Sequence, residues 1–315
     1  MVDKNKGLDW TFNSYSRYLK QKYGCPVYRV AVDAGFSCPH RGEKREKAGC
    51  IYCDEYGSRA PYLGGRASLH DQITDTLSFL RERYKAKEFI LYFQAFSNTY
   101  APVEELKSIY DYGLSLAPFK ELIISTRPDC VDDEKAALLA SYKTAERDVW
   151  VELGLQSAHD ATLKLINRGH TVDDFVRTYK LLKEYRLKLT IHLIFGLPGE
   201  GMKEIMETIR FITVLKPDGI KIHNLHIPYH TELYAQYRRG EITVPSSEKH
   251  LEYVIKALLL LPPSTIIMRL TCDTPILRLA VPQIFLSKQE FFALLRKEMF
   301  SRNLHQGDEY AKKKM

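Results

Sequence analysis

The sequence lacks any apolar run long enough to cross a bilayer, although 45% of its 315 residues are hydrophobic. A membrane-spanning helix needs about 20 consecutive apolar residues, so we expect no membrane segment. The sequence begins Met-Val-Asp-Lys and shows no apolar region typical of a secretory signal. These two absences predict a cytoplasmic protein with no membrane partner.

Cysteine is also scarce, with six in the whole chain. Cys25, Cys130 and Cys272 are widely separated, whereas small proteins stapled by disulfides place their cysteines much more densely. We therefore expect these three to be small buried residues rather than disulfide partners.

There is no linker that would divide the chain and no internal repeat beyond a strand–helix period. Short apolar runs, predicted as strands, alternate with amphipathic stretches, predicted as helices. The expected strands are 28–36, 88–94, 121–126, 149–154, 188–195 and 219–225. The expected helices are 68–86, 102–116, 132–145, 159–166, 171–186 and 201–215. This order predicts an α/β fold with a parallel sheet, as a complete or partial (β/α) barrel, here a partial (β/α)6 barrel; a doubly wound sheet is the alternative.

The helix starts and the C-terminal region complete this outline. Suitable N-cap residues precede four of the helices: Ser68, Asp132, Asp160 and Thr171. A helix at 247–261 closed by two prolines, a strand at 266–271 and a helix at 287–303 are expected to follow. We predict a lead-in over 1–27, a barrel core over 28–230 and a C-terminal α/β extension over 231–315, frayed from Asp308 onward.

Three cysteines lie close together after the first predicted strand: Cys38, Cys50 and Cys53. Thiolates so near one another on a loop indicate a metal or cluster site. Three ligands on an iron–sulfur cluster leave one coordination position open for a substrate or cofactor. Structural zinc completed by His40 is one alternative. A disulfide pair is another, disfavoured because nothing directs the chain to an oxidising compartment.

Polar and small residues recur just past the later strands. They are Ser97, Asn98 and Thr99; Thr126, Arg127 and Asp129; Glu152, Gln156 and Arg168; Gly196 and Pro198; and His223, His226 and His230. In a parallel barrel, chemistry gathers at the carboxyl ends of the strands. We therefore expect these residues to share one pocket.

Together these motifs resemble the radical S-adenosylmethionine (SAM) superfamily. The resemblance rests on the three-cysteine loop with Tyr52 before its last cysteine, on Val151-Glu-Leu-Gly-Leu-Gln-Ser157, on Asn167-Arg-Gly-His-Thr171 and on Gly196-Leu-Pro198. These last segments are similar to the Elongator catalytic-subunit branch and to the oxygen-independent coproporphyrinogen-oxidase-like branch.

The spacing between the first two cysteines is wider than the commonest pattern of the superfamily, as it is in the Elongator branch. Ser125-Thr-Arg-Pro-Asp129 points to the same branch. The whole chain resembles the YhcC/YtqA-type family, also called MnmL, in Cys38-Pro-His40 and Thr271-Cys-Asp-Thr-Pro275.

The resemblance implies a radical SAM enzyme with a [4Fe–4S] cluster on Cys38, Cys50 and Cys53, and SAM on the fourth iron. Reductive cleavage of SAM then gives a 5′-deoxyadenosyl radical. The implied SAM contacts are Tyr52, Ser97, Asn98, Thr99, Thr126, Glu152, Gln156, Arg168, Gly196 and Pro198. Arg168 suits the SAM carboxylate because a guanidinium can make a two-pronged bond. Glu152 could instead be a buried carboxylate paired with a neighbouring base, and Gly196-Leu-Pro198 a simple turn.

The resemblance further implies a substrate. Members of the family are implicated in modifying the carbon-5 side chain of the wobble uridine of tRNA, for example from carboxymethylaminomethyluridine to aminomethyluridine. An electron donor such as flavodoxin or ferredoxin and a downstream SAM-dependent methyltransferase are the implied protein partners. The net charge of +7 agrees with an RNA substrate. So does a tyrosine–arginine run: Tyr229, Tyr234 and Tyr237 beside Arg238 and Arg239.

Two other functions stay open at this point. One is a radical SAM enzyme acting on a small metabolite or a porphyrin-like substrate, and the other is a non-catalytic, zinc-stabilised RNA-binding barrel. Acetyl-CoA chemistry is not expected, because no glycine-rich acetyl-CoA loop follows Gly240. The sequence does not decide whether Cys272 and the three histidines 223, 226 and 230 have chemical or structural roles.

Overall fold

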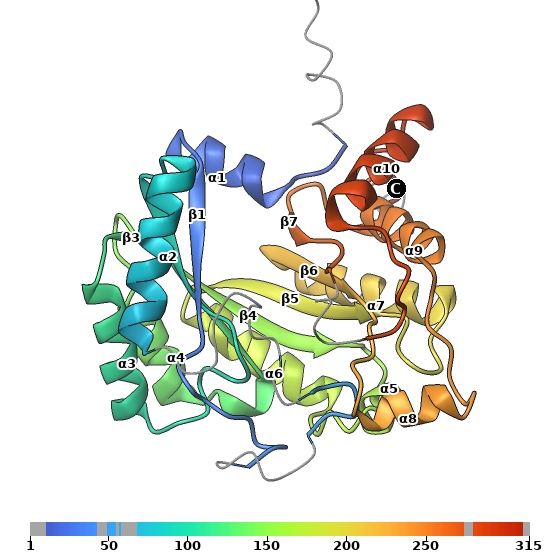
Figure 1. Ribbon diagram of the computed structural model, residues 1–315, viewed down its shortest axis with the longest axis horizontal. Helices are drawn as coiled ribbons and strands as arrows, with labels where there is room; N and C mark the ends of the chain where they lie inside the picture. Colours follow the sequence, from blue (N-terminus) through green and yellow to red (C-terminus); the bar gives the residue numbers. More distant parts are fainter. Residues whose placement is uncertain (1–10, 43–48, 55–56, 58–67, 274–279, 311–315) are drawn as a thin grey trace, which may run out of the picture. The chain divides into compact units, whose positions relative to one another are not determined.

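A computed structural model describes residues 11–42, 49–54, 57, 68–273 and 280–310 (Figure 1). Within these residues, seven strands form one sheet in the order β1-β2-β3-β4-β5-β6-β7. The strands are β1 Val27–Val32, β2 Glu88–Phe93, β3 Phe119–Thr126, β4 Asp148–Gln156, β5 Lys188–Phe195, β6 Gly219–Asn224 and β7 Ile266–Arg269. Strand–helix alternation and parallel pairing confirm the predicted α/β class.

The chain divides into two compact units, which we describe separately. The N-terminal unit comprises residues 16–155 and 168–190, and the C-terminal unit comprises residues 1–15, 156–167 and 191–315. The predicted boundaries at 27/28 and 230/231 stay predictions. Residues 43–48, which include Lys44, Arg45 and Lys47, the Thr-Pro pair at 274–275 and the tail 311–315 lie outside the described residues.

The N-terminal unit holds strands β1 to β4, which pair in parallel with their neighbours. Its helices are α1 Tyr15–Tyr23, α2 Leu69–Tyr84, α3 Val103–Ser115, α4 Asp133–Ser141 and α6 Val172–Glu184, with the 3-10 turn η2 Pro128–Cys130. Figure 1 shows α2 running alongside β1. Ile90, Leu122 and Trp150 are wholly buried because parallel strands are covered on both faces. Glu152 breaks this apolar pattern although it is equally buried.

Helix starts follow the predicted caps with one exception. The side chains of Ser68, Asp132 and Thr171 each accept a backbone N–H of the following turn, as predicted. The prediction for Asp160 was wrong, because α5 Asp160–Leu165 begins at that residue and His159 is its N-cap.

The C-terminal unit holds β6, β7 and the helices α5, α7 Met202–Leu215, α8 Glu232–Arg238, α9 Ser247–Leu260 and α10 Lys288–Ser301. Helix α9 is apolar on nearly all sides and packs against both α7 and α10. No helix in the described ranges is long and apolar enough to cross a membrane.

The three isolated cysteines are unpaired, but only one matches the burial predicted for it. Cys130 is buried, whereas Cys25 and Cys272 are partly exposed, so the prediction was wrong for these two. Cys272 lies beyond the end of β7 rather than in the apolar core.

Candidate active site

The three clustered cysteines lie on the loop that leaves β1 in the N-terminal unit. All three are free thiols; Cys50 is buried, and Cys38 and Cys53 are partly exposed. A tight turn carries the second half of the loop, where the Cys53 N–H donates to the Cys50 carbonyl over 3.0 Å. Among the residues that the structure describes, no three His, Cys, Asp or Glu side chains converge as a group that could hold a single metal ion.

Arg41 ties the two halves of this loop together. Its backbone N–H donates to the Cys38 carbonyl over 2.9 Å. Its guanidinium donates to the carbonyls of Cys53, over 2.6 Å, and Asp54, over 2.5 Å, and the residue is 6% exposed. Gly49 has a φ of +76°, and a Cβ there would lie 3.0 Å from Arg41 Cγ, so both its backbone and its surroundings favour glycine.

Two further arginines approach the buried sulfur. Arg127 Nη1 lies 3.9 Å and Arg168 Nη1 3.8 Å from Cys50 Sγ. Two guanidinium groups beside this sulfur place positive charge where a cluster ligated by thiolates is negative. The donor set therefore fits a negatively charged, thiolate-ligated group.

A network of hydrogen bonds fixes this arginine pair. Arg127 makes a two-pronged bond to Asp129, with both N···O distances 2.8 Å, and donates to the Arg168 carbonyl over 2.7 Å. Burial alone would raise the pKa of Asp129, but the bonds and charge of Arg127 hold that pKa below its ordinary value. Arg168 donates to the Gly154 carbonyl over 3.1 Å.

His170 completes the support of Arg168. Arg168 Nε lies 3.0 Å from His170 Nε2, and His170 Nδ1 lies 3.2 Å from the Thr171 carbonyl. His170 Nε2 also lies 3.1 Å from the Gly154 carbonyl oxygen. Because Arg168 Nε can only donate, we assign Nε2 as its acceptor and place the ring proton on Nδ1. Burial, together with the charge of Arg168, lowers the pKa of His170 to about 3, which keeps the ring neutral.

Tyr52 and Cys53 lie in the same surroundings. Burial, and then the neighbouring Cys50, raises the pKa of Cys53 to about 11. Burial and the neighbouring Cys50 also hold the pKa of Tyr52 well above its ordinary value, although the positive charge of Arg168 acts to lower it. Without a bound cation, the Cys53 thiol and the Tyr52 hydroxyl are therefore protonated at neutral pH.

The residues after β2 and β3 spend much of their hydrogen-bonding capacity on the fold. Asn98 Nδ2 donates to the carbonyls of Phe93, over 3.1 Å, and Ser125, over 2.8 Å. Thr99 Oγ1 donates to the Cys130 carbonyl, so it accepts from Thr126 Oγ1 at 2.6 Å. Ser97 is fully buried beside them. Asn98 Oδ1 has no hydrogen-bond partner within the described ranges, which leaves one buried acceptor for a ligand.

Glu152 and Gln156 differ in their surroundings. Glu152 is fully buried on β4, and the Tyr92 hydroxyl donates to its Oε2 over 2.5 Å. Gln156 ends the strand with a φ of +74° and is partly exposed.

Gly196 and Pro198 belong to the C-terminal unit and are both buried after β5. Gly196 has a φ of +89°, and a Cβ there would overlap the ring of Pro245. In the same unit the rings of His192 and His223 lie 5.7 Å apart, and burial holds the pKa of His223 well below its ordinary value.

Sequence reasoning missed Arg41 and the supporting role of His170. Arg41 carried no signal beyond the general basic character of its loop. His170 lies inside the Asn-Arg-Gly-His-Thr motif, so its proximity to Arg168 in sequence was a usable signal.

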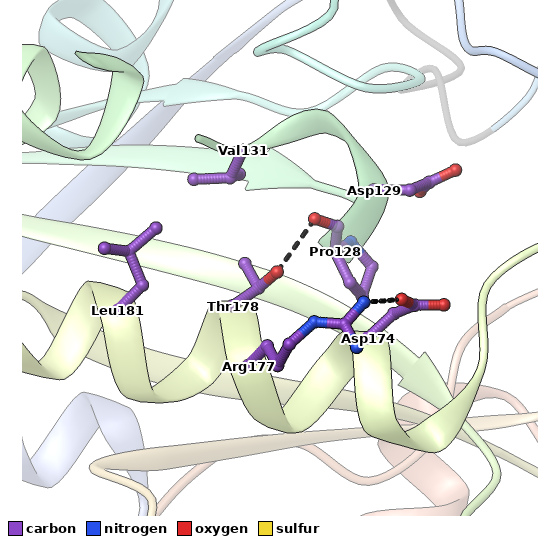
Figure 2. Close-up of a pocket in the computed structure, with 7 residues that line it drawn as sticks. All are labelled: Pro128, Asp129, Val131, Asp174, Arg177, Thr178 and Leu181. Atoms are coloured by element: carbon purple, nitrogen blue, oxygen red, sulfur yellow. Dashed lines mark hydrogen bonds and ion pairs between the residues drawn. The ribbon is translucent and has the colours of Figure 1, made fainter. Parts of the chain in front are cut away.

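A surface hollow of about 410 Å³ includes Asp129, the partner of Arg127, in its lining (Figure 2). Figure 2 shows it between η2 and α6, where the Thr178 hydroxyl donates to the Pro128 carbonyl over 3.0 Å. Its lining residues are Pro128, Asp129, Val131, Asp174, Arg177, Thr178 and Leu181. Of these lining residues, Asp129 alone is connected to the cysteine loop, through its bonds to Arg127. We therefore place the candidate active site at the cysteine loop and not in the hollow.

Comparison with known proteins identifies the fold and the family. The model of the radical SAM superfamily matches residues 38–212, and that of the radical SAM C-terminal domain matches residues 217–301. The chain belongs to the radical SAM superfamily. It is a radical SAM enzyme, and the cofactors of this superfamily are a [4Fe–4S] cluster and SAM.

Several known proteins are similar to this chain. YtqA of Bacillus subtilis is 35% identical over 94% of this chain and 92% of its own. YhcC of Escherichia coli is 40% identical over 68% of each. The tRNA uridine(34) acetyltransferase of Methanocaldococcus jannaschii is 35% identical over 49% of this chain and 28% of its own.

A solved structure shares the fold. The Elp3 protein of Methanocaldococcus infernus, lacking its N-terminus, superposes with a TM-score of 0.67 at 22% identity. The superposition covers 92% of this chain and 68% of that one. It agrees with the predicted partial barrel of the radical SAM type.

Proposed function

We propose that this enzyme modifies the carbon-5 side chain of the wobble uridine in tRNA, converting carboxymethylaminomethyluridine to aminomethyluridine. The observation that carries the proposal is the similarity to a tRNA uridine(34) acetyltransferase over 49% of this chain. The similarity to YtqA and YhcC along most of the chain agrees with the YhcC/YtqA-type family.

Cys38, Cys50 and Cys53 are the proposed ligands of the [4Fe–4S] cluster. Ligands of such a cluster bind different iron atoms, so they stand farther apart than the ligands of a single ion. When bound, the cluster and SAM supply one-electron cleavage of the sulfonium and hydrogen abstraction from the substrate. Arg41 holds the loop that carries the ligands, and Arg127 and Arg168 balance the negative charge of the Cys50 thiolate.

The other SAM contacts are proposals of differing strength. Arg168 uses Nε, one Nη2 hydrogen and one Nη1 hydrogen within the protein, which leaves one hydrogen on each Nη atom for the SAM carboxylate. Asn98 Oδ1 is the buried acceptor for the SAM amino group. Glu152 and Gln156 are proposed for the ribose, and Tyr52 with Gly196 and Pro198 for the adenine. Thr99 and Thr126 act by bracing the ends of β2 and β3, and Ser97 is proposed, together with Asn98, for the SAM amino group.

A row of tyrosines in the C-terminal unit supports an RNA substrate. The rings of Tyr229 and Tyr234 stack with centroids 4.2 Å apart, and Tyr237 continues the row at 6.4 Å. Arg238 on α8 is exposed beside them. Aromatic faces next to a cation are the elements that bind unpaired bases by stacking, as in an anticodon loop.

The decisive experiment uses protein reconstituted anaerobically with iron and sulfide. It is supplied with SAM, reduced flavodoxin or ferredoxin, and tRNA from cells that lack the protein. We expect 5′-deoxyadenosine and, by nucleoside mass spectrometry, loss of carboxymethylaminomethyluridine with gain of aminomethyluridine. Cys50→Ala should abolish both products, whereas Cys25→Ala, at a partly exposed cysteine outside the loop, should leave both unchanged.

The outcomes separate the open functions. Cleavage of SAM without any change in the nucleosides would overturn the tRNA assignment and favour a small metabolite. Zinc in place of iron, with no cleavage, would favour the non-catalytic RNA-binding barrel. Tyr234→Ala should weaken tRNA binding by about 1–3 kcal/mol, whereas Tyr112→Ala, at a 45%-exposed tyrosine of α3, should not.

The cellular setting is part of the proposal. The proposed chemistry requires two protein partners. One is a low-potential electron donor, and the other is a downstream SAM-dependent methyltransferase that acts on the amine of aminomethyluridine. Both, like tRNA, are found in the cytoplasm, where we place the protein.

A further inference from the structure

Aromatic and basic side chains gather on the surface of the N-terminal unit where α2 ends. Two large rings are exposed there, Phe79 at 57% and Tyr84 at 52%, and their centroids lie 6.1 Å apart, edge to face. Arg83 and Lys85 are exposed on either side of the tyrosine in the sequence, and the exposed Lys87 follows them. We call these five residues the α2 patch.

Part of this arrangement serves the fold. The Tyr84 ring stacks on the ring of Tyr28 from β1, with centroids 5.5 Å apart. The Arg81 guanidinium lies over the Phe89 ring at 5.2 Å, so this arginine is used within the unit. Basic residues at the end of a helix also interact favourably with the helix dipole. These contacts account for Arg81 and for one side of Tyr84, but they do not account for the exposed ring of Phe79.

The region of the patch is positively charged. Residues 81–87 hold four basic side chains and one acidic side chain, Glu82, which leaves a net charge of +3. The next acidic residue, Glu88, lies 3.7 Å from the ammonium group of Lys120 and is paired with it. A concentration of positive charge attracts a polyanion, and exposed rings among cations bind unpaired bases by stacking. The chemistry of the patch therefore fits RNA with an unpaired segment.

The position of the patch limits which partner can use it. Near the start of α2, Gln72 Oε1 accepts the Asp33 N–H over 2.8 Å, just past the end of β1. At the other end of the helix, Tyr84 stacks on Tyr28, near the start of β1 (Figure 1). The helix runs about 18 Å from Gln72 to Tyr84. The patch and the cysteine loop, which leaves the end of β1, therefore lie at opposite ends of this strand.

This separation favours RNA over the other partners of the enzyme. A nucleoside or small metabolite bound at the cysteine loop is too short to reach the patch. An electron donor has to dock close to the cluster, which the far end of β1 does not allow. A polyanion as large as tRNA can contact both ends of the strand at once.

We propose that the α2 patch binds RNA away from the reacting nucleotide, with Arg83, Lys85 and Lys87 on backbone phosphates and Phe79 stacked against an unpaired base. The inference deepens the proposed function and rests on it, because tRNA is the RNA substrate proposed above. It assigns part of the tRNA affinity to a surface that takes no part in the chemistry.

The test measures the affinity of the reconstituted enzyme for tRNA as a function of salt. Replacing the three patch cations together (R83Q, K85Q and K87Q) should weaken binding about tenfold or more at about 0.1 M salt. The plot of log affinity against log salt concentration should become less steep by about 2, because fewer counterions are released from the RNA. Equal slopes in the wild type and this triple variant would overturn the proposal.

The matched control removes the same charge elsewhere. It replaces three exposed bases that are each paired with a carboxylate, Lys107, Arg177 and Lys249, by glutamine. This control variant should keep the wild-type slope. A loss of slope equal to that of the patch variant would show that only the net charge matters, and would overturn the assignment to the patch.

Two single substitutions separate charge from stacking. Glu82→Lys adds positive charge to the patch and should tighten tRNA binding about threefold or more, a gain that misfolding cannot imitate. Phe79→Ala should weaken binding about fivefold or more and leave the salt slope unchanged, because stacking releases no counterions. Unchanged binding by Glu82→Lys would overturn the phosphate contacts, and unchanged binding by Phe79→Ala would overturn the stacking contact.

Two further readouts identify the partner. The KM for reduced flavodoxin should be the same in the wild type and the triple patch variant. A raised KM with unchanged tRNA binding would assign the patch to the electron donor and overturn the RNA site. If tRNA binding follows the expected pattern while carboxymethylaminomethyluridine persists in the treated tRNA, the proposed conversion fails and the RNA-binding surface stands.

Discussion

Arg41 offers the sharpest test of how this chain holds its cluster loop. Replacing it with methionine keeps an apolar stem but removes the two hydrogen bonds to the carbonyls of Cys53 and Asp54. A hydrogen bond from a charged group contributes about 1.5–3 kcal/mol. We use the lower value, because Arg41 Nε is buried with no hydrogen-bond partner in the described part of the chain. Burying that N–H costs free energy and offsets part of what the two hydrogen bonds contribute. Two bonds then give about 3 kcal/mol, or about 100-fold in the population of the closed loop.

The assay is retention of iron by the reconstituted protein against a chelator, under anaerobic conditions. We expect Arg41→Met to lower the apparent cluster affinity about 100-fold while the unfolding temperature of the metal-free protein changes little, since loops open locally. Arg177→Met is the matched control, because Arg177 is an exposed arginine paired with Asp174 on α6. Equal iron retention in wild type and Arg41→Met would refute the reasoning, as would equal losses in the two variants.

Three further predictions concern the same loop and its supports. Gly49→Ala should destabilise the loop by about 1–2 kcal/mol because its backbone is left-handed, and further because the new Cβ would clash with Arg41. The variant should therefore lose iron faster than Gly24→Ala, where φ is a similar +72° but the surrounding space is open. Equal iron loss in the two variants would show that the clash is unimportant. His170 is neutral in the fold but takes a proton when unfolded, so stability should fall as the pH drops below about 6.5, by about 2 kcal/mol between pH 7 and 5. Urea titrations of His170→Gln should lack this fall, and a fall of the same size would contradict the assignment. Asp129→Asn should lower the free energy of unfolding at neutral pH. The pKa of Asp129 is lowered in the fold, so its ionised carboxylate stabilises the protein at pH values above the ordinary carboxyl pKa and does so less as the pH falls. A difference from wild type that persists undiminished at pH 3 would contradict this.

Most of the fold was predictable because its elements obey local rules. Strand β2 carries an unbroken apolar run over 89–93, and the centres of β3 and β5 are rich in leucine and isoleucine. Ser68 and Thr171 cap helices as their side chains allow. Helices α1 and α8 were missed because both are short, and the tyrosines and charges on them give no clear apolar stripe.

The site was only partly predictable, for a physical reason. The spacing of the cysteines and the Arg168 motif are visible in the sequence. The contacts of Arg127 and Arg168 with the Cys50 sulfur join residues far apart in the chain and depend on β3 and β4 being neighbours. The tethering of Cys53 by Arg41 depends on a side-chain direction that no periodicity encodes.

The contact between His40 and Gly169 has a consequence for how such chains diverge. A Cβ at position 169 would occupy the space of the His40 ring, and φ there is +75°. The two positions come from separate motifs, one before the second cysteine and one beside Arg168. A side chain at 169 cannot be added while the ring stays in place, so homologues that carry a larger residue at 169 should have replaced the histidine at 40. Covariation of this pair across natural sequences would reveal the packing without any coordinates.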